Sequence, residues 1–243
     1  MLPNILQKLE CQESTQTLLQ AIQNKKTTAL YEIAEGEYSF LSALLHIKLN
    51  RPIIIVQNNE VKAAKLCKEL ENLGCPALHV PARDKQFSRV AQSQEAIWDR
   101  LTTLCKITET PQTIICCSME AFNDIQCPKE NLQNQRFTLQ VGEFIAPQDI
   151  LEKLLKIGFE RVQMVEGKGQ CALRGDILDI FSPHSGSAIR IEFFDDEIDT
   201  IRSFDCISQR SVKNIEACEI CPASECLLTA KQSEAAITNL KAL

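Results

Sequence analysis

The sequence contains no long hydrophobic segment and lacks the charge balance of a typical DNA-binding domain. No uninterrupted apolar run approaches the roughly 18 residues of a membrane-spanning helix, so we expect no membrane association of that kind. Acidic residues exceed basic ones, 32 against 26, and the net charge of −6 argues against a free-standing duplex-DNA binder. Residues 1–7 carry no basic segment followed by an apolar one, so we expect no secretory signal and a cytoplasmic location.

The sequence also lacks a recognisable catalytic set. Its three histidines, His46, His79 and His184, stand far apart, so their spacing supports no Ser–His–Asp or Cys–His arrangement. Asp176 and Asp179 are close enough to act as paired carboxylates but have no partnering histidine. An acidic cluster stands where a turn is expected between two strands, and we interpret it as solvated rather than as a cation site. This cluster comprises Asp195, Asp196, Glu197 and Asp199.

Cysteine, by contrast, is abundant, with twelve residues in 243. A cytoplasmic location implies reduced thiols, and several stand in apolar segments where cysteine acts as a small buried hydrophobe. Only Cys218, Cys221 and Cys226 have a spacing that a metal ion could use. A structural zinc site requires four ligands, and neither a second Cys-x2-Cys pair nor a nearby histidine completes this one. We therefore predict no metal site.

Apolar runs and amphipathic stretches alternate along the first half of the chain. Residues 52–56 and 113–117 are apolar runs typical of strands buried on both faces of a parallel sheet. The amphipathic segments between such runs indicate helices that cover the sheet, which predicts an α/β fold. The expected helices cover residues 5–24, 39–49, 60–73 and 89–107, and the expected strands cover residues 27–33, 53–56, 76–80 and 113–117.

The pattern changes after a polar segment at residues 123–135, which we interpret as a linker. A region rich in expected strands follows and predicts a second, α+β domain. Its helix begins near Pro147 and ends at Gly158, and its strands are expected at residues 136–141, 159–165, 172–181, 188–194 and 198–204. From residue 211 we expect one strand and a helix that runs to residue 243, as in a piece of a longer protein. The predicted domains are therefore residues 1–125, 126–211 and 212–243.

The loop after the first expected strand is where a nucleotide-binding α/β domain would hold phosphates. Such a loop requires glycines, a lysine for the phosphates and a Ser or Thr for Mg²⁺. The corresponding residues here are Ala34, Glu35, Gly36, Glu37, Tyr38 and Ser39. They include one glycine, no lysine and two carboxylates that would repel a triphosphate. We therefore expect a degenerate nucleotide loop without a ligand.

The expected strand at 188–194 offers the clearest candidate for a binding surface. Strand alternation places three apolar side chains on one face and Arg190 and Phe194 on the other. If the expected strand at 172–181 pairs with it, Arg174 comes close to Phe194 and completes an Arg–Arg–Phe patch. Arginine and aromatic side chains are favoured at protein–protein hot spots. The alternative is that Phe194 packs against a neighbouring helix and the arginines pair with acidic residues.

Three segments of this region carry a resemblance to a known family. They are Leu173-Arg174-Gly175-Asp176-Ile177-Leu178-Asp179-Ile180-Phe181, the run from Arg190 to Asp205, and Ser208-Gln209-Arg210-Ser211. The region resembles the UvrB-homology region shared by the excision-repair protein UvrB and the transcription-repair coupling factor (Mfd) family. UvrB has an intact nucleotide loop and an aromatic-rich hairpin that grips DNA, whereas this chain has a degenerate loop, two tyrosines and one tryptophan. The resemblance therefore favours the coupling-factor family.

The resemblance implies a fold and a function. The fold would be a RecA-like domain of the P-loop type without a working nucleotide loop, plus an inserted α+β domain like domain 2 of UvrB. The inserted domain would bind UvrA through Arg174, Arg190 and Phe194, with no catalytic activity and no cofactor in this chain. ATP, Mg²⁺, RNA polymerase and duplex DNA would be bound by other domains of the full-length protein. A C-terminal domain of that protein would mask the UvrA-binding surface.

Two other functional classes remain open from the sequence. One is a UvrB-like ATPase, which the missing lysine and hydroxyl residues of the nucleotide loop argue against. The other is a DNA-gripping module with a local basic patch formed by Lys153, Lys156, Arg161 and Lys168. Mg-ATP affinity would favour the first class and steeply salt-dependent DNA binding the second.

Overall fold

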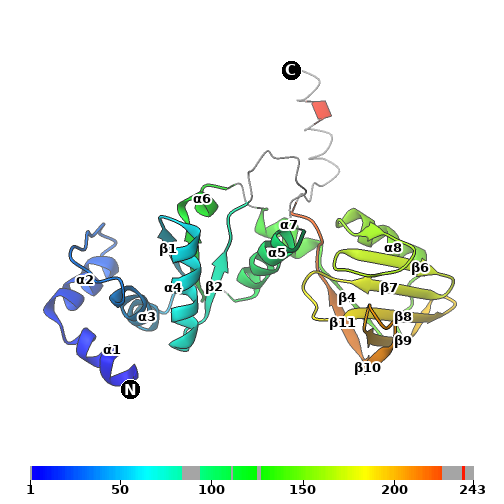
Figure 1. Cartoon of the computed structure of the whole chain (residues 1–243), viewed down its shortest axis with the longest axis horizontal. Helices are drawn as coiled ribbons and strands as arrows, with labels where there is room; N and C mark the ends of the chain where they lie inside the picture. The colour runs from blue at the N-terminus through cyan, green and yellow to red at the C-terminus, as the bar shows by residue number, and fades with distance from the viewer. Residues whose placement is uncertain (1, 84–93, 111, 125–126, 226–236, 239–243) are drawn as a thin grey trace. The chain divides into compact units, whose positions relative to one another are not determined.

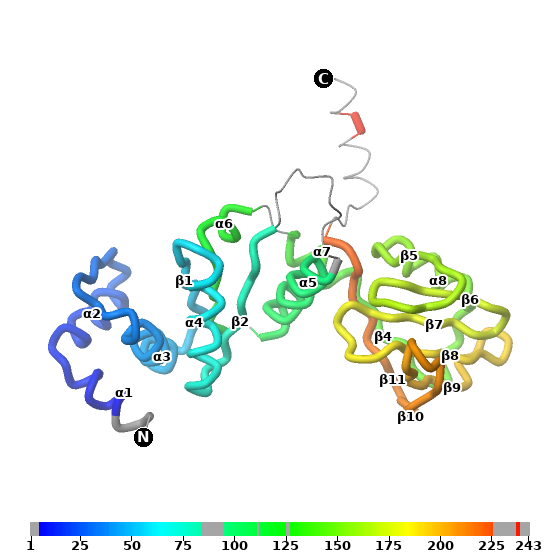
Figure 2. Tube along the Cα trace, in the orientation of Figure 1, coloured from blue at the N-terminus to red at the C-terminus, as the bar shows by residue number. Residues whose placement is uncertain are grey.

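The computed structural model describes residues 2–83, 94–110, 112–124, 127–225 and 237–238 (Figures 1 and 2). The chain divides into two compact units. Unit 1 contains residues 1–91 and 109–124, and unit 2 contains residues 92–108 and 125–243. Nowhere in the described ranges is a helix long and apolar enough to cross a membrane.

Unit 1 is built on a three-stranded parallel sheet (Figure 1). The strands are β1 (Ile53–Gln57), β2 (Ala77–Val80) and β3 (Ile114–Ser118), and their order is β1-β3-β2. The central strand β3 is the most buried of the three, as expected for a strand with a neighbour on each side. The predicted α/β arrangement with a parallel sheet is therefore confirmed for this unit.

The helices of unit 1 pack against that sheet and against each other. Helix α4 (Glu60–Asn72) begins at Asn59, whose Oδ1 accepts a hydrogen bond of 2.9 Å from the backbone N–H of Lys62. It buries Ala63, Leu66, Cys67 and Leu70, and the last three belong to a core shared with β3 and β2. The remaining helices of the unit are α1 (Leu2–Glu10), α2 (Glu13–Gln23), α3 (Glu37–Leu49) and α6 (Met119–Phe122).

Two expectations for the first 40 residues are wrong. The helix expected at 5–24 is two helices, which are separated at Cys11 and Gln12. The strand expected at 27–33 is neither helix nor strand, so the first strand of the chain is β1. The expected nucleotide loop at 34–39 therefore follows no strand. A RecA-like topology for this unit remains a prediction.

Unit 2 contains a six-stranded sheet with the order β10-β9-β8-β7-β6-β5. Neighbouring strands are antiparallel except for β5 and β6, which are parallel. The strands are β5 (Glu160–Arg161), β6 (Gln170–Arg174), β7 (Ile177–Phe181), β8 (Ala188–Phe194), β9 (Glu197–Phe204) and β10 (Ser211–Ile215).

One face of this sheet supplies the main core of unit 2. Helix α8 (Pro147–Lys156) contributes three fully buried side chains, Ile150, Leu151 and Leu154. A two-stranded sheet of β4 (Phe137–Gln140) and β11 (Ala217–Ile220) adds further apolar side chains to the same core. Each fully buried aliphatic side chain stabilises the fold by about 2 kcal/mol relative to exposure. Helices α5 (Gln94–Glu109) and α7 (Lys129–Asn134) share a smaller cluster.

The structure corrects several expectations in unit 2. The strand expected at 172–181 is a hairpin, because β6 and β7 are joined by a tight turn at Gly175 and Asp176. The expected linker contains α7, whose Leu132 is buried. Beyond residue 211 the chain forms two strands, β10 and β11, and both pair within unit 2. The helix expected to run to residue 243 lies outside the described residues apart from residues 237 and 238, which are helical.

Candidate docking surface

The second face of the six-stranded sheet, which we call the outer face, carries the predicted binding residues. Strand β8 buries Ile189, Ile191 and Phe193 in the main core. Its alternate residues point to the outer face, where Phe194 is exposed and Arg190 is partly buried. The predicted alternation of the two faces of β8 is therefore confirmed.

The strand register brings the two arginines together around one carboxylate. Asp179 of β7 lies directly opposite Arg190 of β8 and opposite Ala172 of β6. Arg174 lies two residues beyond Ala172 and therefore on the same face. Arg190 donates from Nε to Asp179 Oδ1 at 2.7 Å and from Nη2 to Oδ2 at 2.9 Å, while Arg174 Nη2 reaches Oδ2 at 2.5 Å. One aspartate therefore binds both arginines.

Burial makes this triad rigid. The Asp179 side chain is fully buried, and Arg190 keeps 17% of its side chain exposed. The hydrogen bond to Asp179 raises the pKa of Arg190 above its ordinary value, so the guanidinium stays charged. The Arg190 guanidinium also stands 4.5 Å from the centre of the Phe204 ring and donates to Gln209 Oε1 at 3.1 Å. Arg174 is freer, with 42% of its side chain exposed.

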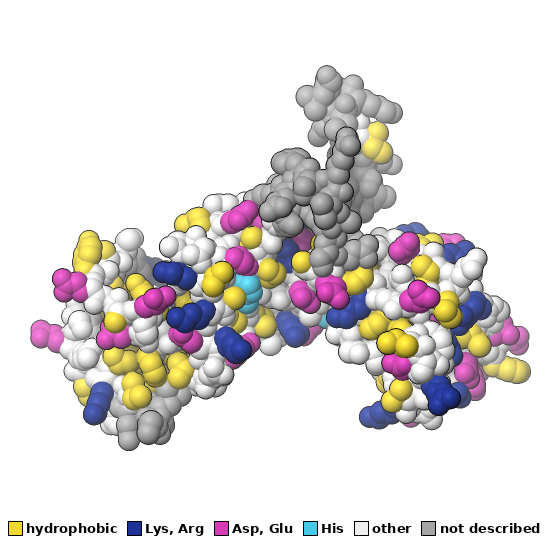
Figure 3. Space-filling view, viewed as in Figure 1, with side chains coloured by type: hydrophobic (Ala, Val, Ile, Leu, Met, Phe, Trp, Pro, Cys, Tyr) yellow, Lys and Arg dark blue, Asp and Glu magenta, His cyan; other side chains and the backbone are white. Residues whose placement is uncertain are grey.

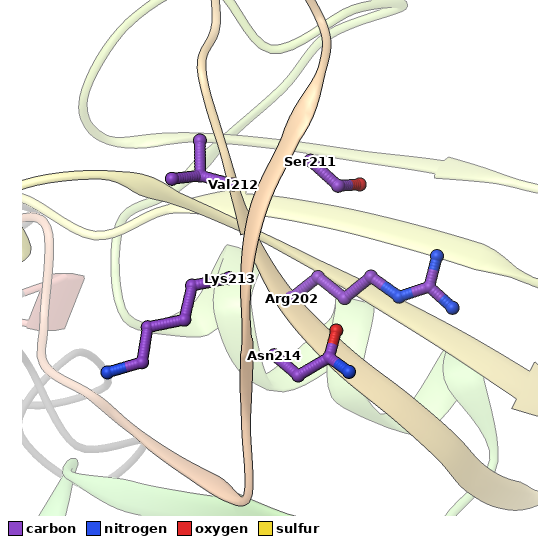
Figure 4. Close-up of a pocket in the computed structure, with 5 residues that line it drawn as sticks. All are labelled: Arg202, Ser211, Val212, Lys213 and Asn214. Atoms are coloured by element: carbon purple, nitrogen blue, oxygen red, sulfur yellow. The ribbon is translucent and has the colours of Figure 1, made fainter.

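A second ion pair lies beside the triad. Arg202 of β9 reaches Glu192 of β8 at 3.3 Å, and the Thr200 hydroxyl donates to the other carboxylate oxygen at 3.1 Å. Both Arg202 and Glu192 are about one-third exposed. A surface depression next to this pair is lined by Arg202, Ser211, Val212, Lys213 and Asn214. Figure 4 shows Arg202 and Asn214 on one side of β10 and Lys213 on the other.

Phe194 ends strand β8 with 72% of its surface exposed. It is followed by a two-residue turn of Asp195 and Asp196, and Asp195 adopts a φ of +54°. The alternative in which Phe194 packs against a helix is therefore wrong, whereas pairing of the arginines with an acidic residue is confirmed. Phe194 shares the outer face with Arg174 but lies two strands away from it, so the patch is broader than the sequence predicts.

Comparison with known proteins matches this region to a family. Residues 137–226, which include the whole six-stranded sheet, match the UvrB interaction domain. The transcription-repair-coupling factor of Bacillus subtilis is 30% identical over 204 residues, which cover 83% of this chain and 17% of that protein. That of Staphylococcus aureus strain USA300 is 35% identical over 197 residues, 79% of this chain and 16% of the relative.

The chain is similar to transcription-repair-coupling factors along most of its length, and residues 137–226 carry the UvrB interaction domain. It spans about a sixth of the length of the curated relatives that it matches. The residues of the outer face that carry the Arg–Arg–Phe patch all lie inside the matched domain.

The expected nucleotide loop, in contrast, begins a helix. The backbone N–H of Ala34 donates to Glu37 Oε2 at 3.3 Å, and the N–H of Glu37 donates to the Ala34 carbonyl at 2.9 Å. These reciprocal bonds satisfy donors at the start of α3, where Tyr38 and Ser39 are already helical. Glu35 and Gly36 form the turn before the helix. Absence of a ligand at these residues remains a prediction.

The structure places the candidate carboxylate pair, the acidic cluster and the spaced cysteines in different surroundings. Asp176 is exposed in the hairpin turn and Asp179 is buried, so the two do not act as paired carboxylates. Asp195, Asp196 and Asp199 are exposed, as expected for a solvated turn. Cys218 and Cys221 are buried, and Cys226 lies outside the described residues. Within the part of the chain that the structure describes, no three His, Cys, Asp or Glu side chains are grouped to hold a metal.

The proposed basic patch is partly engaged within unit 2. Lys153 of α8 lies over the Phe137 ring, 5.7 Å from its centre, and Lys156 lies 4.0 Å from Glu152. The visible face of the molecule shows basic and acidic side chains interspersed rather than one broad basic area (Figure 3).

Sequence reasoning considered Asp179 only as a paired carboxylate and missed its role, which is to join the two arginines. Its signal was a lone carboxylate inside an apolar strand, since Ile177-Leu178-Asp179-Ile180-Phe181 offers no other charge. A buried aspartate requires a cationic partner. The two arginines on adjacent strands are the partners that such a residue predicts.

Proposed function

We propose that unit 2 is a non-catalytic docking module that mimics UvrB and recruits UvrA in transcription-coupled nucleotide-excision repair. The observation that carries this proposal is an exposed phenylalanine on the same sheet face as an arginine pair held by a buried aspartate, within a UvrB interaction domain. Arginines and aromatics are enriched among residues that dominate binding energy at interfaces.

The rigidity of the arginine pair supports this role. A flexible arginine loses on the order of 1 kcal/mol of side-chain entropy when a partner immobilises it. Arg190 has already lost that freedom, because Asp179, Gln209 and the Phe204 ring fix its guanidinium. Phe194 adds a large apolar surface with only two rotatable bonds. The outer face is therefore preorganised for a partner with acidic and apolar groups.

The proposal extends to the other activities that the resemblance implies for the full-length protein. We infer that the full-length protein binds RNA polymerase, duplex DNA, ATP and Mg²⁺ through other domains, and that one of these domains covers the outer face until polymerase is engaged. The present chain is then expected to bind UvrA without hydrolysing ATP.

The affinity of the chain for UvrA from the same organism tests the proposal. Phe194→Ala is expected to weaken binding about thirtyfold or more, because loss of a hot-spot side chain costs about 2 kcal/mol. Arg174→Ala is the second variant, since Arg190 alone still pairs with Asp179. Arg190→Ala is less informative, because it removes the more buried partner of Asp179 and weakens the fold itself.

Phe122→Ala is the matched control, because Phe122 is 53% exposed and lies in unit 1. Its affinity for UvrA is expected to equal that of the wild type. Failure of the wild-type chain to bind UvrA at about 100 µM, a concentration that would detect a binding free energy of about −5.5 kcal/mol, would overturn the proposal.

A further inference from the structure

A second phenylalanine lies on the outer face beyond the three predicted residues. Phe144 is 76% exposed, slightly more than Phe194. It belongs to the segment 142–145, between β4 and α8, which forms no regular strand but pairs with the start of β9. Its neighbour Ile145 points the other way and packs against the main core.

Backbone hydrogen bonds fix the position of this segment. The N–H of Ile145 donates to the Asp196 carbonyl at 2.7 Å, and the N–H of Ile198 donates to the Glu143 carbonyl at 2.9 Å. The N–H of Gly142 donates to the Ile198 carbonyl at 2.8 Å. Phe144 is therefore held directly opposite Glu197 by bonds on both sides.

This register places the two phenylalanines in one row. Glu197 lies opposite Phe144 on one side and opposite Phe194 of β8 on the other. Residues directly opposite on neighbouring strands project from the same face. Two strand spacings of 4.7–4.9 Å separate the backbones of the phenylalanines by about 10 Å. The row thus consists of the Phe144 ring, the Glu197 carboxylate and the Phe194 ring, in that order.

Packing within unit 2 does not account for the exposure of Phe144. The core beneath the row is filled by Phe193, Ile198 and Ile145. Two large apolar side chains held in the open, with charged groups around them, are typical of a protein-binding surface. The row adjoins the Glu192–Arg202 pair, so it continues the proposed docking surface rather than forming a separate one.

We propose that Phe144 is a second aromatic anchor for UvrA and that it binds together with Phe194. The inference rests on the proposed function. It specifies the partner surface as two apolar pockets about 10 Å apart, which is the distance from the first to the third of three adjacent strands. A lysine or arginine of UvrA lies between these pockets and pairs with Glu197.

The affinity of Phe144→Ala for UvrA tests this inference, with Phe194→Ala and Phe122→Ala measured in parallel. We expect Phe144→Ala to weaken binding about tenfold, as for a substantial interface contact. The loss in the double variant Phe144→Ala/Phe194→Ala should equal the product of the two single losses, because residues about 10 Å apart in separate pockets act independently. Phe144→Leu, which keeps apolar bulk, should retain most of the affinity.

A further variant tests the predicted basic group. Glu197→Gln keeps the side-chain shape and is expected to weaken binding severalfold at low salt and less at high salt, because salt screens the lost ion pair. Equal affinity of Glu197→Gln and the wild type would overturn this part of the inference.

The outcomes separate the two proposals. Wild-type binding that is reduced by Phe194→Ala but unchanged by Phe144→Ala would overturn the second anchor and leave the docking function in place. Absence of wild-type binding would overturn both. An unfolding midpoint equal to that of the wild type establishes that the variants are folded, since Phe144 has little surface to lose from the core.

Discussion

At the scale of single residues, Asp179 decides how the arginines of the outer face are presented. The alternation of β8 was readable from the sequence because apolar and polar residues alternate without interruption from Ile189 to Phe193. The role of Asp179 was not, because it depends on the register between three strands. A one-residue slip would place the carboxylate on the opposite face from both arginines.

Replacing Asp179 should therefore destabilise unit 2. Asp179→Asn removes the charge that compensates two arginines, and we expect the free energy of unfolding to fall by about 3 kcal/mol, as for other broken buried ion pairs. Asp176→Asn is the control, since Asp176 is exposed in the hairpin turn, and should change stability by less than about 0.5 kcal/mol. Denaturant unfolding measures both. Equal stability of the two variants would contradict the role assigned to Asp179.

Burial also decides how the thiols react. It raises the pKa of Cys171 and of Cys218 to about 11, so both thiols remain protonated at pH 8 in the folded protein. Cys11 is exposed. Because the thiolate is the nucleophile, iodoacetamide at pH 8 should modify Cys11 well before Cys171 or Cys218, as peptide mass mapping would show. Equal rates for the three thiols in the folded chain would contradict this burial.

At the scale of elements, the hairpin β6–β7 and the end of α8 depend on glycines. The prediction of a continuous strand at 172–181 did not account for Gly175, where φ is +58° and the chain reverses. Apolar residues on both sides concealed the turn, and the Gly–Asp pair was its only signal. The strand expected at 27–33 failed for a different reason. Its β-branched and aromatic residues favour a strand, but a strand also needs a neighbour to pair with, which local sequence does not reveal.

Replacing Gly175 and replacing Gly158 by alanine should lower the free energy of unfolding by different amounts, because only the second substitution meets a neighbouring residue. Gly175→Ala is expected to cost about 1 kcal/mol, the strain of a left-handed alanine, since a Cβ there meets nothing within 4 Å. Gly158 has a φ of +94°, and an added Cβ would lie 2.4 Å from Ser224 Cβ. Gly158→Ala should therefore cost at least about 2 kcal/mol more, because overpacking adds to the strain. Unfolding midpoints would contradict this account if the two variants were equally stable.

At the scale of the whole molecule, the sequence predicted the α/β and α+β character of the two regions, and the domain limits at residues 125 and 211 stay a prediction. The buried runs at β1 and β3 identified the parallel sheet. The grouping of residues 92–108 with unit 2 depends on long-range contacts, such as the ion pair of 3.1 Å between Arg100 and Glu225. No local sequence pattern indicates that Arg100 pairs with a residue 125 positions further along the chain.

The whole chain is expected not to bind nucleotide. The segment 34–39 begins a helix, follows no strand and presents two carboxylates, so we expect titration of the chain with Mg-ATP to give no binding at millimolar concentration. Saturable binding at micromolar Mg-ATP would contradict the docking-module proposal and favour a UvrB-like ATPase.

The most direct test of the docking surface is hydroxyl-radical footprinting of the wild-type chain with and without UvrA. Phe194 and Phe144 are exposed and should be oxidised readily in the free chain. Bound UvrA should protect both rings, while Phe122 and Tyr31 of unit 1, also exposed, should be oxidised as before. Protection confined to unit 1, or undiminished oxidation of Phe194 in a saturated complex, would contradict the assignment of the outer face to UvrA.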